Sequence, residues 1–509
     1  MTAERRLMNR PAGGAAMALL AGGLQALAGS LAEPSALLQL LAMVTLATLL
    51  GSATPRQAGT RGFLFGLAAT AGGLWWIYIS LHDYGHLPGW AAAAAVLALS
   101  AFMALFSVVT AVGFALSRTE SAGSLTRVLL FAAWWLIGEL LTGSVLGGFP
   151  WLAAGYAHAD SLFAPWAAWV GVPGIGFGVA VLAAATAESL AARRPQRVLG
   201  VPVLLVLIGQ ILPQDFTHPV GSLQVALLQG NVAQDEKFDR SRLWADLDWY
   251  GSTLGLTPAD LIVTPETAVP LLPASLPQAY WDEIEAGLNR TGAHALIGLP
   301  LGDARQGYTN SVIGMSPAAS GPAVYRYDKY HLLPFGEFIP AGFRWFVDLL
   351  QIPLGDFGRG RVDAPSFRVG VQRVAPTICV ENLYGEELAQ RFGSGEAADP
   401  TLLVNLSNLG WFGRSSASGQ HLQIARLRSL EFQRPMLTSA NTGVTAIVDH
   451  RGQVLARLPE FRREVLIGTV EGRGGRTPFA RWACAWGLLP LWLFAGGLIG
   501  VCRGVGRRR

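Results

Sequence analysis

The sequence predicts an α-helical transmembrane bundle of about eight spans joined to a separate α/β domain. The chain of 509 residues is 51% hydrophobic and only 14% charged, which is too apolar for an ordinary soluble enzyme. Long stretches before residue 213 carry almost no Asp, Glu, Lys or Arg, whereas residues 220–475 have a normal globular composition. Strand-like and helix-like runs alternate in that polar region, as they do in α/β domains.

Each candidate span is an apolar run, because a bilayer core of about 30 Å takes roughly 20 helical residues to cross. The spans are expected near residues 12–31, 35–53, 62–81, 89–116, 127–146, 162–189, 198–213 and 480–502. The first resembles a signal peptide, but similar spans follow it at once, so we expect it to be retained. The chain thus divides into a transmembrane region (1–219), a polar domain (220–475) and a C-terminal transmembrane helix with a basic tail (476–509).

Basic residues in alternate loops predict the orientation. They are Arg5, Arg6, Arg10, Arg56, Arg61, Arg118, Arg127, Arg193, Arg194, Arg197, Arg503, Arg507, Arg508 and Arg509. The other loops carry Glu33, His82, Asp83, His86 and Asp160, without Lys or Arg. By the positive-inside rule both termini are cytoplasmic and the polar domain is extracytoplasmic, which in a double-membraned bacterium means the periplasm. This distribution accounts for the net charge of +4 without a nucleic-acid partner.

The polar domain contains three stretches that each end an apolar, strand-like run with a reactive side chain. Residues 263–270 carry Glu266, residues 327–337 carry Lys329 and residues 375–382 carry Cys379. A carboxylate, an ammonium and a thiol supply a base, a cation for a developing oxyanion and a nucleophile, which suffice for acyl transfer. The structural alternatives are a strand-end surface Glu, a solvated Lys and an inert buried Cys.

The order Glu, Lys, Cys with these flanking sequences resembles the nitrilase (carbon–nitrogen hydrolase) superfamily. The longer stretches 329–340 and 376–382, set between membrane spans, resemble its membrane-bound acyltransferase branch, and the likeness covers nearly the whole chain. The resemblance implies a four-layer αββα sandwich. Periodicity alone does not distinguish that fold from a doubly wound sheet.

The resemblance further implies a ping-pong reaction without cofactor or metal. Glu266 deprotonates Cys379, and the thiolate takes an acyl chain from a phospholipid, usually phosphatidylethanolamine. The amino group of a diacylglyceryl-cysteine apolipoprotein then accepts the chain, in the last step of lipoprotein maturation. The eight His residues form no ligand-spaced set, in agreement with chemistry that needs no metal.

The residues around Cys379 predict how the thiol is activated. Asn382 and residues 383–388 are typical of a cap and a following helix, so the helix dipole is expected to favour the thiolate. The backbone N–H of Val380 is expected beside the reacting carbonyl. Partial burial at the end of its strand suits Glu266 as a general base.

Further site residues come from the resemblance. Glu337 is expected to contact Lys329 and Glu266, and Glu381 to shape the pocket by the thiol, with purely structural pairing as the alternative. The expected substrate-binding residues are Trp411, Phe412, Phe238 and Tyr330. Phe238 stands where the family has Trp, which leaves its role open, and core packing is the alternative for each aromatic residue.

Other charged residues are interpreted as structural. Glu139 lies within an apolar span, where an ionisable group is either functional or an interhelical partner, and we favour the partner. Arg426, Arg428, Glu431 and Arg434 are expected to form ion pairs along one helical run.

The need to hold the thiol at the membrane surface explains why such an enzyme has transmembrane spans. Each buried CH₂ contributes about 0.8 kcal/mol against leaving the bilayer, so a thiol at the membrane surface reaches a lipid ester without extracting the chain. Two alternatives remain: a membrane-tethered amidase whose second substrate is water, and a transporter or lipid-binding protein with an inactive nitrilase domain.

Overall fold

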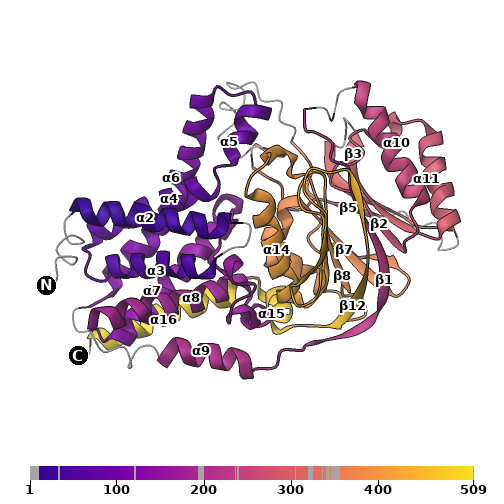
Figure 1. The fold of residues 1–509 in the computed structure, drawn as a ribbon. Helices are drawn as coiled ribbons and strands as arrows, with labels where there is room; N and C mark the ends of the chain where they lie inside the picture. The colour runs from indigo at the N-terminus through magenta and orange to yellow at the C-terminus, as the bar shows by residue number, and fades with distance from the viewer. Residues whose placement is uncertain are drawn as a thin grey trace. The chain divides into compact units, whose positions relative to one another are not determined.

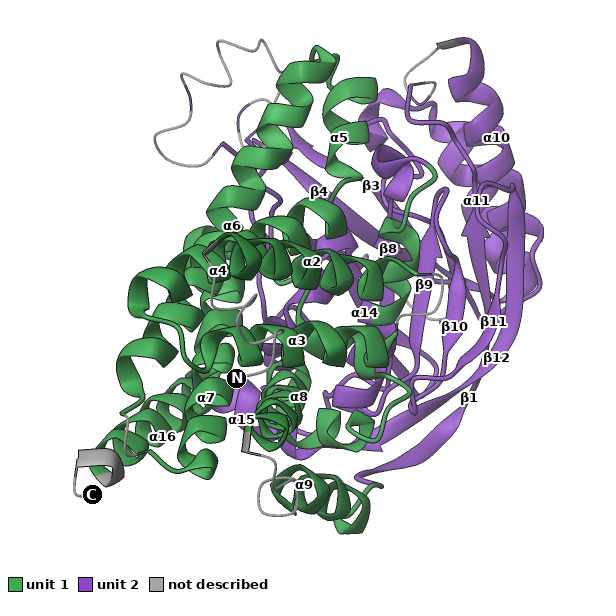
Figure 2. Ribbon diagram, turned by 60° about the vertical axis from the view of Figure 1, so that its left-hand side comes forward, with its two compact units in different colours: residues 1–214, 414–423, 486–509 green, residues 215–413, 424–485 purple. Residues whose placement is uncertain are grey.

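The structure is a computed structural model (Figure 1), and it describes residues 11–31, 35–119, 122–192, 200–235, 237, 240–303, 305, 307–318, 325–334, 336–339, 344 and 356–507. The chain forms two compact units (Figure 2). Unit 1 comprises residues 1–214, 414–423 and 486–509, and unit 2 comprises residues 215–413 and 424–485.

Unit 1 is built from apolar helices that match the expected spans. They are α2 (Pro11–Ser30), α3 (Ala36–Leu50), α4 (Pro55–Gly73), α5 (Ile77–Ile79), α6 (Gly89–Ser117), α7 (Ser124–Ser144), α8 (Ala167–Ala192), α9 (Gly200–Ile211) and α16 (Leu489–Arg507). Capping residues mark the positions where two of these helices begin. The side chain of Ser35 accepts from Leu38 N at the start of α3, and Thr54 and Gln57 form a capping box at the start of α4.

The transmembrane bundle is confirmed, but fewer helices than eight are long enough to span a membrane. Among the described residues, four helices are long and apolar enough to cross a membrane, or up to six if each of two bent helix pairs is counted as one span. The pairs are Pro55–Gly73 with Ile77–Tyr84, bent by 62°, and Pro478–Trp486 with Leu489–Gly504, bent by 91°. The second bend follows from Gly487, whose φ of +55° ends a right-handed helix. Helices α3 and α9 are apolar but shorter.

Small residues let the helices of unit 1 approach closely. A Cβ at Gly22 of α2 would lie 2.2 Å from the carbonyl oxygen of Phe65 in α4, so glycine is required at this crossing. In α7, Glu139 Oε1 accepts hydrogen bonds from Trp135 Nε1 at 3.0 Å and from the backbone N–H of Ala154 at 2.8 Å. Glu139 therefore ties α7 to the segment that follows it.

Unit 2 contains two six-stranded sheets, ordered β12-β1-β2-β3-β4-β5 and β11-β10-β9-β8-β7-β6. The strands of the first are β1 (Thr217–Gln229), β2 (Leu261–Val263), β3 (His294–Asp303), β4 (Gly307–Met315), β5 (Tyr325–Asp328) and β12 (Glu464–Gly475). Those of the second are β6 (Phe367–Val369), β7 (Gln372–Ile378), β8 (Leu402–Ser407), β9 (Met436–Ala440), β10 (Ala446–Val448) and β11 (Val454–Arg457). Strands β1, β2 and β3 pair in parallel, as do β7, β8 and β9, and antiparallel strands flank them on both sides of each sheet.

The sheets face each other and helices cover their outer sides (Figure 1). Ser439 Oγ of β9 donates to the carbonyl oxygens of Leu228 and Val263 in the first sheet, at 2.9 and 3.2 Å. Helices α10 (Arg240–Leu256) and α11 (Gln278–Thr291) pack on the first sheet through a continuous apolar core. Helix α14 (Ala417–Phe432) lies on the outer side of the second sheet (Figure 1), and the short helix α13 (Gly385–Ala389) follows the turn at Cys379. The predicted αββα sandwich is confirmed.

The charged residues in and just after α14 make structural contacts. Arg428 Nη1 and Glu431 Oε2 pair at 2.9 Å with both side chains buried, and Arg434 Nε donates to the carbonyl oxygen of Pro400 at 2.6 Å. Arg426 Nε donates to the carbonyl oxygen of Gly452 at 2.6 Å. Residues 414–423, which include the first turns of α14, belong to unit 1 and the rest of the helix belongs to unit 2, a division that the sequence pattern did not predict.

A glycine contact between α10 and α11 predicts a stability effect. A Cβ at Gly287 would lie 2.2 Å from Gly255 Cα, so Gly287→Leu is expected to destabilise unit 2 by about 1–3 kcal/mol through overpacking. The midpoint of thermal unfolding of the detergent-purified protein measures this. Gly419→Ala is the control, because no atom lies within 4 Å of its Cβ position. Equal midpoints for Gly287→Leu and the parent would contradict the packing argument.

Candidate active site

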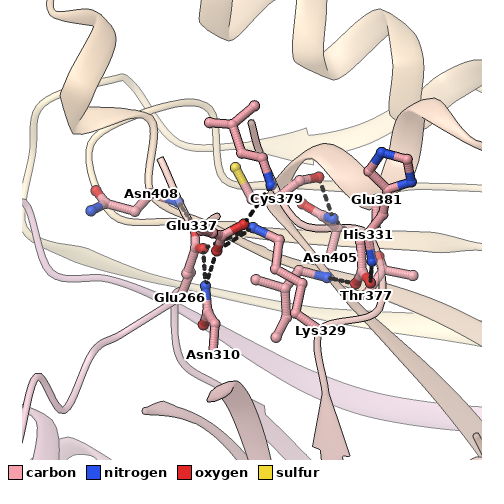
Figure 3. Close-up of polar contacts among 12 residues, drawn as sticks. Glu266, Asn310, Lys329, His331, Glu337, Thr377, Cys379, Glu381, Asn405 and Asn408 are labelled. Carbon is pink, nitrogen blue, oxygen red and sulfur yellow. Dashed lines mark hydrogen bonds and ion pairs between the residues drawn. The ribbon is translucent and has the colours of Figure 1, made fainter. Parts of the chain in front are cut away.

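The three reactive side chains come from strand ends in both sheets. Glu266 follows β2, Lys329 follows β5 of the same sheet, and Cys379 follows β7 of the facing sheet. Figure 3 shows these residues grouped with Glu337, Asn310 and Asn408. The site is buried, with Glu266 9%, Lys329 2% and Cys379 8% exposed. The facing of the two sheets is therefore what brings the thiol to the carboxylate and the ammonium.

Lys329 lies at the centre of the charges. Its Nζ lies 2.8 Å from Glu337 Oε1 and 3.6 Å from Glu266 Oε1. Burial alone would lower the pKa of Lys329, but the negative charges of Glu337 and Glu266 raise it above its ordinary value. Burial likewise opposes ionisation of Glu337, yet the Lys329 ammonium holds the pKa of that carboxyl below its usual range. Lys329 is thus a permanent cation.

Two asparagines that the sequence reasoning missed orient the carboxylates. Asn310 Nδ2, on β4, donates to Glu266 Oε1 at 2.7 Å and to Glu337 Oε1 at 2.8 Å. The backbone N–H of Asn408, after β8, donates to Glu266 Oε2 at 2.9 Å. The Leu333 N–H donates to Glu337 Oε2 at 2.9 Å. Each carboxylate oxygen named here has a fixed donor, so the orientation of both groups is set before any substrate arrives.

Cys379 has a strained backbone, with φ +54°, a region that non-glycine residues rarely occupy. Asn405 Nδ2 stabilises this turn by donating to the carbonyl oxygen of Cys379 and to Thr377 Oγ1, both at 3.0 Å. Neither Asn405 nor Thr377 was singled out from the sequence. Cys379 lies beside Lys329 and Glu337 (Figure 3), and the charges of Glu266, Lys329 and Glu337 act on its thiol.

The expected thiolate is not the resting form. Burial, followed by the charge of Glu266, raises the pKa of Cys379 well above its ordinary value, although Lys329 and the Asn408 amide oppose the shift. The helix-dipole argument fails because residues 379–383 form one 3₁₀ turn, and α13 begins only at Gly385 and has five residues. The thiol is therefore protonated at neutral pH and requires a base.

Glu381 fastens the Cys379 turn to the Lys329 loop. It accepts hydrogen bonds from Tyr327 Oη at 2.7 Å and from the backbone N–H groups of Ile378, Tyr330 and His331, at 2.6, 2.7 and 3.1 Å. Burial raises the pKa of Glu381, which is 5% exposed. These bonds join the backbone on both sides of the site. Val380, the expected oxyanion donor, is buried beside it at 3% exposure.

The expected substrate-binding aromatics have different environments. Trp411 is 41% exposed and Phe412 is 9% exposed in the 3₁₀ turn Leu409–Phe412. Tyr330 is partly buried next to Lys329, and Phe238 lies outside the described residues. Trp411 is therefore accessible to a ligand, whereas Phe412 packs inward.

A further lysine, not expected from the sequence, lies near Glu266. Lys237 is 6% exposed, and burial lowers its pKa to about 8 against the opposing charge of Glu266. Both residues line one small pocket together with Tyr250 and Asn441. Among the described residues, no three His, Cys, Asp or Glu side chains are grouped so that they could hold a metal ion.

Two facing sheets with a thiol, a carboxylate and a buried ammonium at their strand ends define a carbon–nitrogen hydrolase domain. The model of the carbon–nitrogen hydrolase family matches residues 224–478, and that of the apolipoprotein N-acyltransferase N-terminal domain matches residues 21–185. The chain belongs to the apolipoprotein N-acyltransferase family, and it is an acyltransferase.

Curated relatives support this assignment over most of their length. The apolipoprotein N-acyltransferase of Verminephrobacter eiseniae is 45% identical over 90% of this chain and 89% of its own. That of Ralstonia nicotianae is 44% identical over 87% of this chain and 85% of its own. Among solved structures, the C. elegans NitFhit protein aligns with a TM-score of 0.37 and 17% identity, over 50% of this chain and 62% of its own.

The electrostatics of the site predict how fast Cys379 is alkylated. Glu266 raises the pKa of the thiol and Lys329 lowers it, so Glu266→Gln should speed and Lys329→Met should slow its reaction with iodoacetamide at pH 8. Each unit of pKa change alters the thiolate fraction by about tenfold. The parent rate should still rise with pH above 8, because its pKa lies higher.

Alkylation is measured by mass spectrometry in a Cys484→Ala, Cys502→Ala background, which leaves Cys379 as the remaining cysteine. Arg368→Gln, at an exposed position of β6, serves as the control. Rates that change in the reverse order for Glu266→Gln and Lys329→Met would contradict the described electrostatics.

Proposed function

We propose that this chain transfers a fatty acyl chain from a membrane phospholipid, phosphatidylethanolamine in particular, to the N-terminal amino group of a diacylglyceryl-cysteine apolipoprotein. The transfer passes through a thioester on Cys379. The observation that carries the proposal is the buried Cys379 thiol, which is grouped with one fixed cation and two oriented carboxylates (Figure 3). Membership of the apolipoprotein N-acyltransferase family supports the choice of donor and acceptor.

In the first half-reaction Glu266 removes the proton from Cys379, and Sγ attacks the ester carbonyl of the phospholipid. The Sγ–C bond forms and the ester C–O bond breaks. Glu266 returns the proton to the leaving alkoxide, and lysophospholipid departs. The raised pKa of Cys379 explains why deprotonation is coupled to attack instead of preceding it.

The tetrahedral intermediate carries an oxyanion that needs fixed donors. Lys329 supplies a permanent positive charge, and the backbone N–H of Val380 is the proposed second donor. Glu337 holds the Lys329 ammonium at 2.8 Å, so the cation is in place before the charge develops. Glu381 acts as a positioning residue, since its four hydrogen bonds fix the turn and the loop.

In the second half-reaction the free amino group of the apolipoprotein attacks the thioester. The N–C bond forms, the C–S bond breaks, and Glu266 transfers a proton from the nitrogen to Sγ. The amide product leaves and the thiol is restored. Trp411, exposed at the turn after β8, is the proposed contact for the incoming acyl chain or acceptor, with Phe412, Tyr330 and Phe238 as further candidates.

The apolar helices and the family fit a bacterial inner-membrane protein. We further propose that both termini are cytoplasmic and that the nitrilase-like domain is periplasmic. The basic loops at Arg56, Arg118 and Arg127 support this orientation.

Replacement of Cys379 separates the proposed reaction from its alternatives. Purified protein is incubated with labelled phospholipid and a diacylglyceryl-cysteinyl peptide. Amide indicates transfer, free fatty acid indicates an amidase, and neither indicates a binding protein. Cys379→Ala should abolish both lysophospholipid release and amide formation, and Cys379→Ser should retain the fold with little activity. A lysophospholipid signal of parental size from Cys379→Ala would refute the assignment of Cys379 as the nucleophile.

Lys329→Met tests the oxyanion role. Loss of one preorganised donor is expected to lower kcat by about 100- to 1000-fold in both half-reactions. Glu266→Gln should be equally impaired in acylation even though its thiol alkylates faster, because a thiolate alone lacks a proton donor for the leaving group. Arg368→Gln is the matched control for a lost cation. Parental kcat in Lys329→Met would exclude the proposed role.

A further inference from the structure

Lysine is rare in this chain, and both of its lysines lie near Glu266. Of the 38 basic residues in the sequence, Lys237 and Lys329 are lysines and all the others are arginines. Both are buried, and the charge of Glu266 acts on each of them. An ammonium is a compact charge, whereas a guanidinium is larger and planar. The acyl-transfer mechanism gives a role to Lys329 and none to Lys237.

The segment that carries Lys237 is fixed at two points to the strand ends of the second sheet. Asn441, after β9, holds both backbone groups of Val232: the Val232 N–H donates to Asn441 Oδ1 at 2.9 Å, and Asn441 Nδ2 donates to the Val232 carbonyl oxygen at 2.7 Å. Closer to Lys237 along the chain, Gln234 Oε1 accepts from Asn408 Nδ2 at 2.8 Å. All of these side chains are buried, so the segment has a defined position in the domain.

The same hydrogen bonds reach the proposed general base. Asn408, which holds the segment through its side chain, donates its backbone N–H to Glu266 Oε2 at 2.9 Å. Its Oδ1 accepts from Asn441 Nδ2 at 3.1 Å. Lys237, Glu266 and Asn441 line one small pocket. The position of Lys237 is therefore coupled to that of the Glu266 carboxylate.

Glu266 is the charge in this pocket that Lys237 can compensate. Two other titratable groups, Asp246 and Tyr250 of α10, also line the pocket. Asp246 already forms an ion pair with Arg463, which precedes β12. Tyr250 is neutral, because burial raises its pKa. The ammonium of Lys237 therefore acts on Glu266.

The charges around Glu266 do not balance without Lys237. Lys329 supplies one positive charge to two carboxylates, Glu337 at 2.8 Å and Glu266 at 3.6 Å. The closer contact is to Glu337, and Lys329 holds the pKa of that carboxyl below its usual range. Cys379 is neutral, because burial and the carboxylates raise its pKa. Two buried carboxylates with one cation leave one negative charge uncompensated, which is costly away from water.

The uncompensated charge decides whether Glu266 can act as a base. When two carboxylates lie close together without enough cations, one of them takes up a proton, and Lys329 is the farther from Glu266. A proton on Glu266 would leave Cys379 without an acceptor. Burial lowers the pKa of Lys237 to about 8, so its ammonium is charged at neutral pH. Glu381 does not enter this balance, because four hydrogen bonds stabilise its own carboxylate.

We propose that Lys237 is a positioning residue for the acylation step, whose ammonium keeps Glu266 ionised so that this carboxylate can take the proton of Cys379. The proposal rests on the proposed function and adds a charged partner to its general base. The role requires no contact between Lys237 and substrate, and no bond forms or breaks at Lys237. Its effect is confined to the pH range in which Glu266 would otherwise hold a proton.

The pH–rate profile of thioester formation tests this role. Lys237→Met should move the acid limb to higher pH by about one unit, because a carboxylate that loses a neighbouring cation ionises less readily. At a pH on the acid limb of the parent, the rate should fall about tenfold. Above about pH 9 the two rates should converge, because Lys237 of the parent is then neutral as well. Loss of a merely structural contact would lower the rate equally at every pH.

Two further variants serve as controls. Lys237→Arg keeps the positive charge and should leave the acid limb at its parental pH, whatever its plateau rate. Arg290→Met removes a cation from an exposed position of α11 and should retain the parental profile. Failure of the parent to form a thioester would reject the proposed function, and the protonation of Glu266 would then be measured without substrate.

Infrared difference spectroscopy provides that measurement. Spectra of the detergent-purified protein are recorded over about pH 4 to 9, and the carboxylic-acid C=O band that is lost in Glu266→Gln is assigned to Glu266. In Lys237→Met this band should persist to a pH about one unit higher than in the parent, whereas Lys237→Arg should resemble the parent.

Two results would overturn the inference. An acid limb and a Glu266 band at the parental pH in Lys237→Met would show that the ammonium does not act on the base. A loss of rate that is equal at every pH, in both Lys237→Met and Lys237→Arg, would mean that Lys237 only holds its segment in place.

Discussion

The Lys329 ammonium, shared between Glu337 at 2.8 Å and Glu266 at 3.6 Å, is the interaction on which the site depends. Taking an ammonium out of water is costly unless nearby charges and hydrogen bonds compensate. Here two carboxylates do so, and Asn310 joins those carboxylates to each other. The cluster therefore holds its charges in fixed positions, and substrate meets an electrostatic environment that needs no reorganisation.

Cys379 is controlled by opposing charges. Burial and the carboxylates favour the neutral thiol, and Lys329 favours the thiolate. A nucleophile that stays protonated at rest is protected from oxidation and stray alkylation, because these reactions need the thiolate. The strained backbone of Cys379 is held by Asn405, and the adjoining turn by Glu381. The position and the protonation state of the Cys379 thiol are thus set by a few buried groups around it.

Polar side chains also lie among the apolar helices of unit 1, where they form hydrogen bonds. Glu139 and Gln420 are both engaged in hydrogen bonds within this unit, and their partners include indole and backbone N–H groups. Such groups are stabilising only when their partners are present, since lipid offers none.

The sequence alone determined the two-part architecture, the strand-end positions of Glu266, Lys329 and Cys379, and the family. Apolar run length and local strand patterns are properties of neighbouring residues, so a sequence displays them directly. Asn310, Asn408 and Lys237 were missed, because the role of an asparagine or a lysine depends on the side chains that surround it in the folded domain. The protonated state of Cys379 was decided by the tertiary structure for the same reason, because burial and charge proximity depend on packing between distant segments. The bends in two helical segments were also not predicted, because a backbone conformation such as the φ of +55° at Gly487 is not visible in the length of an apolar run.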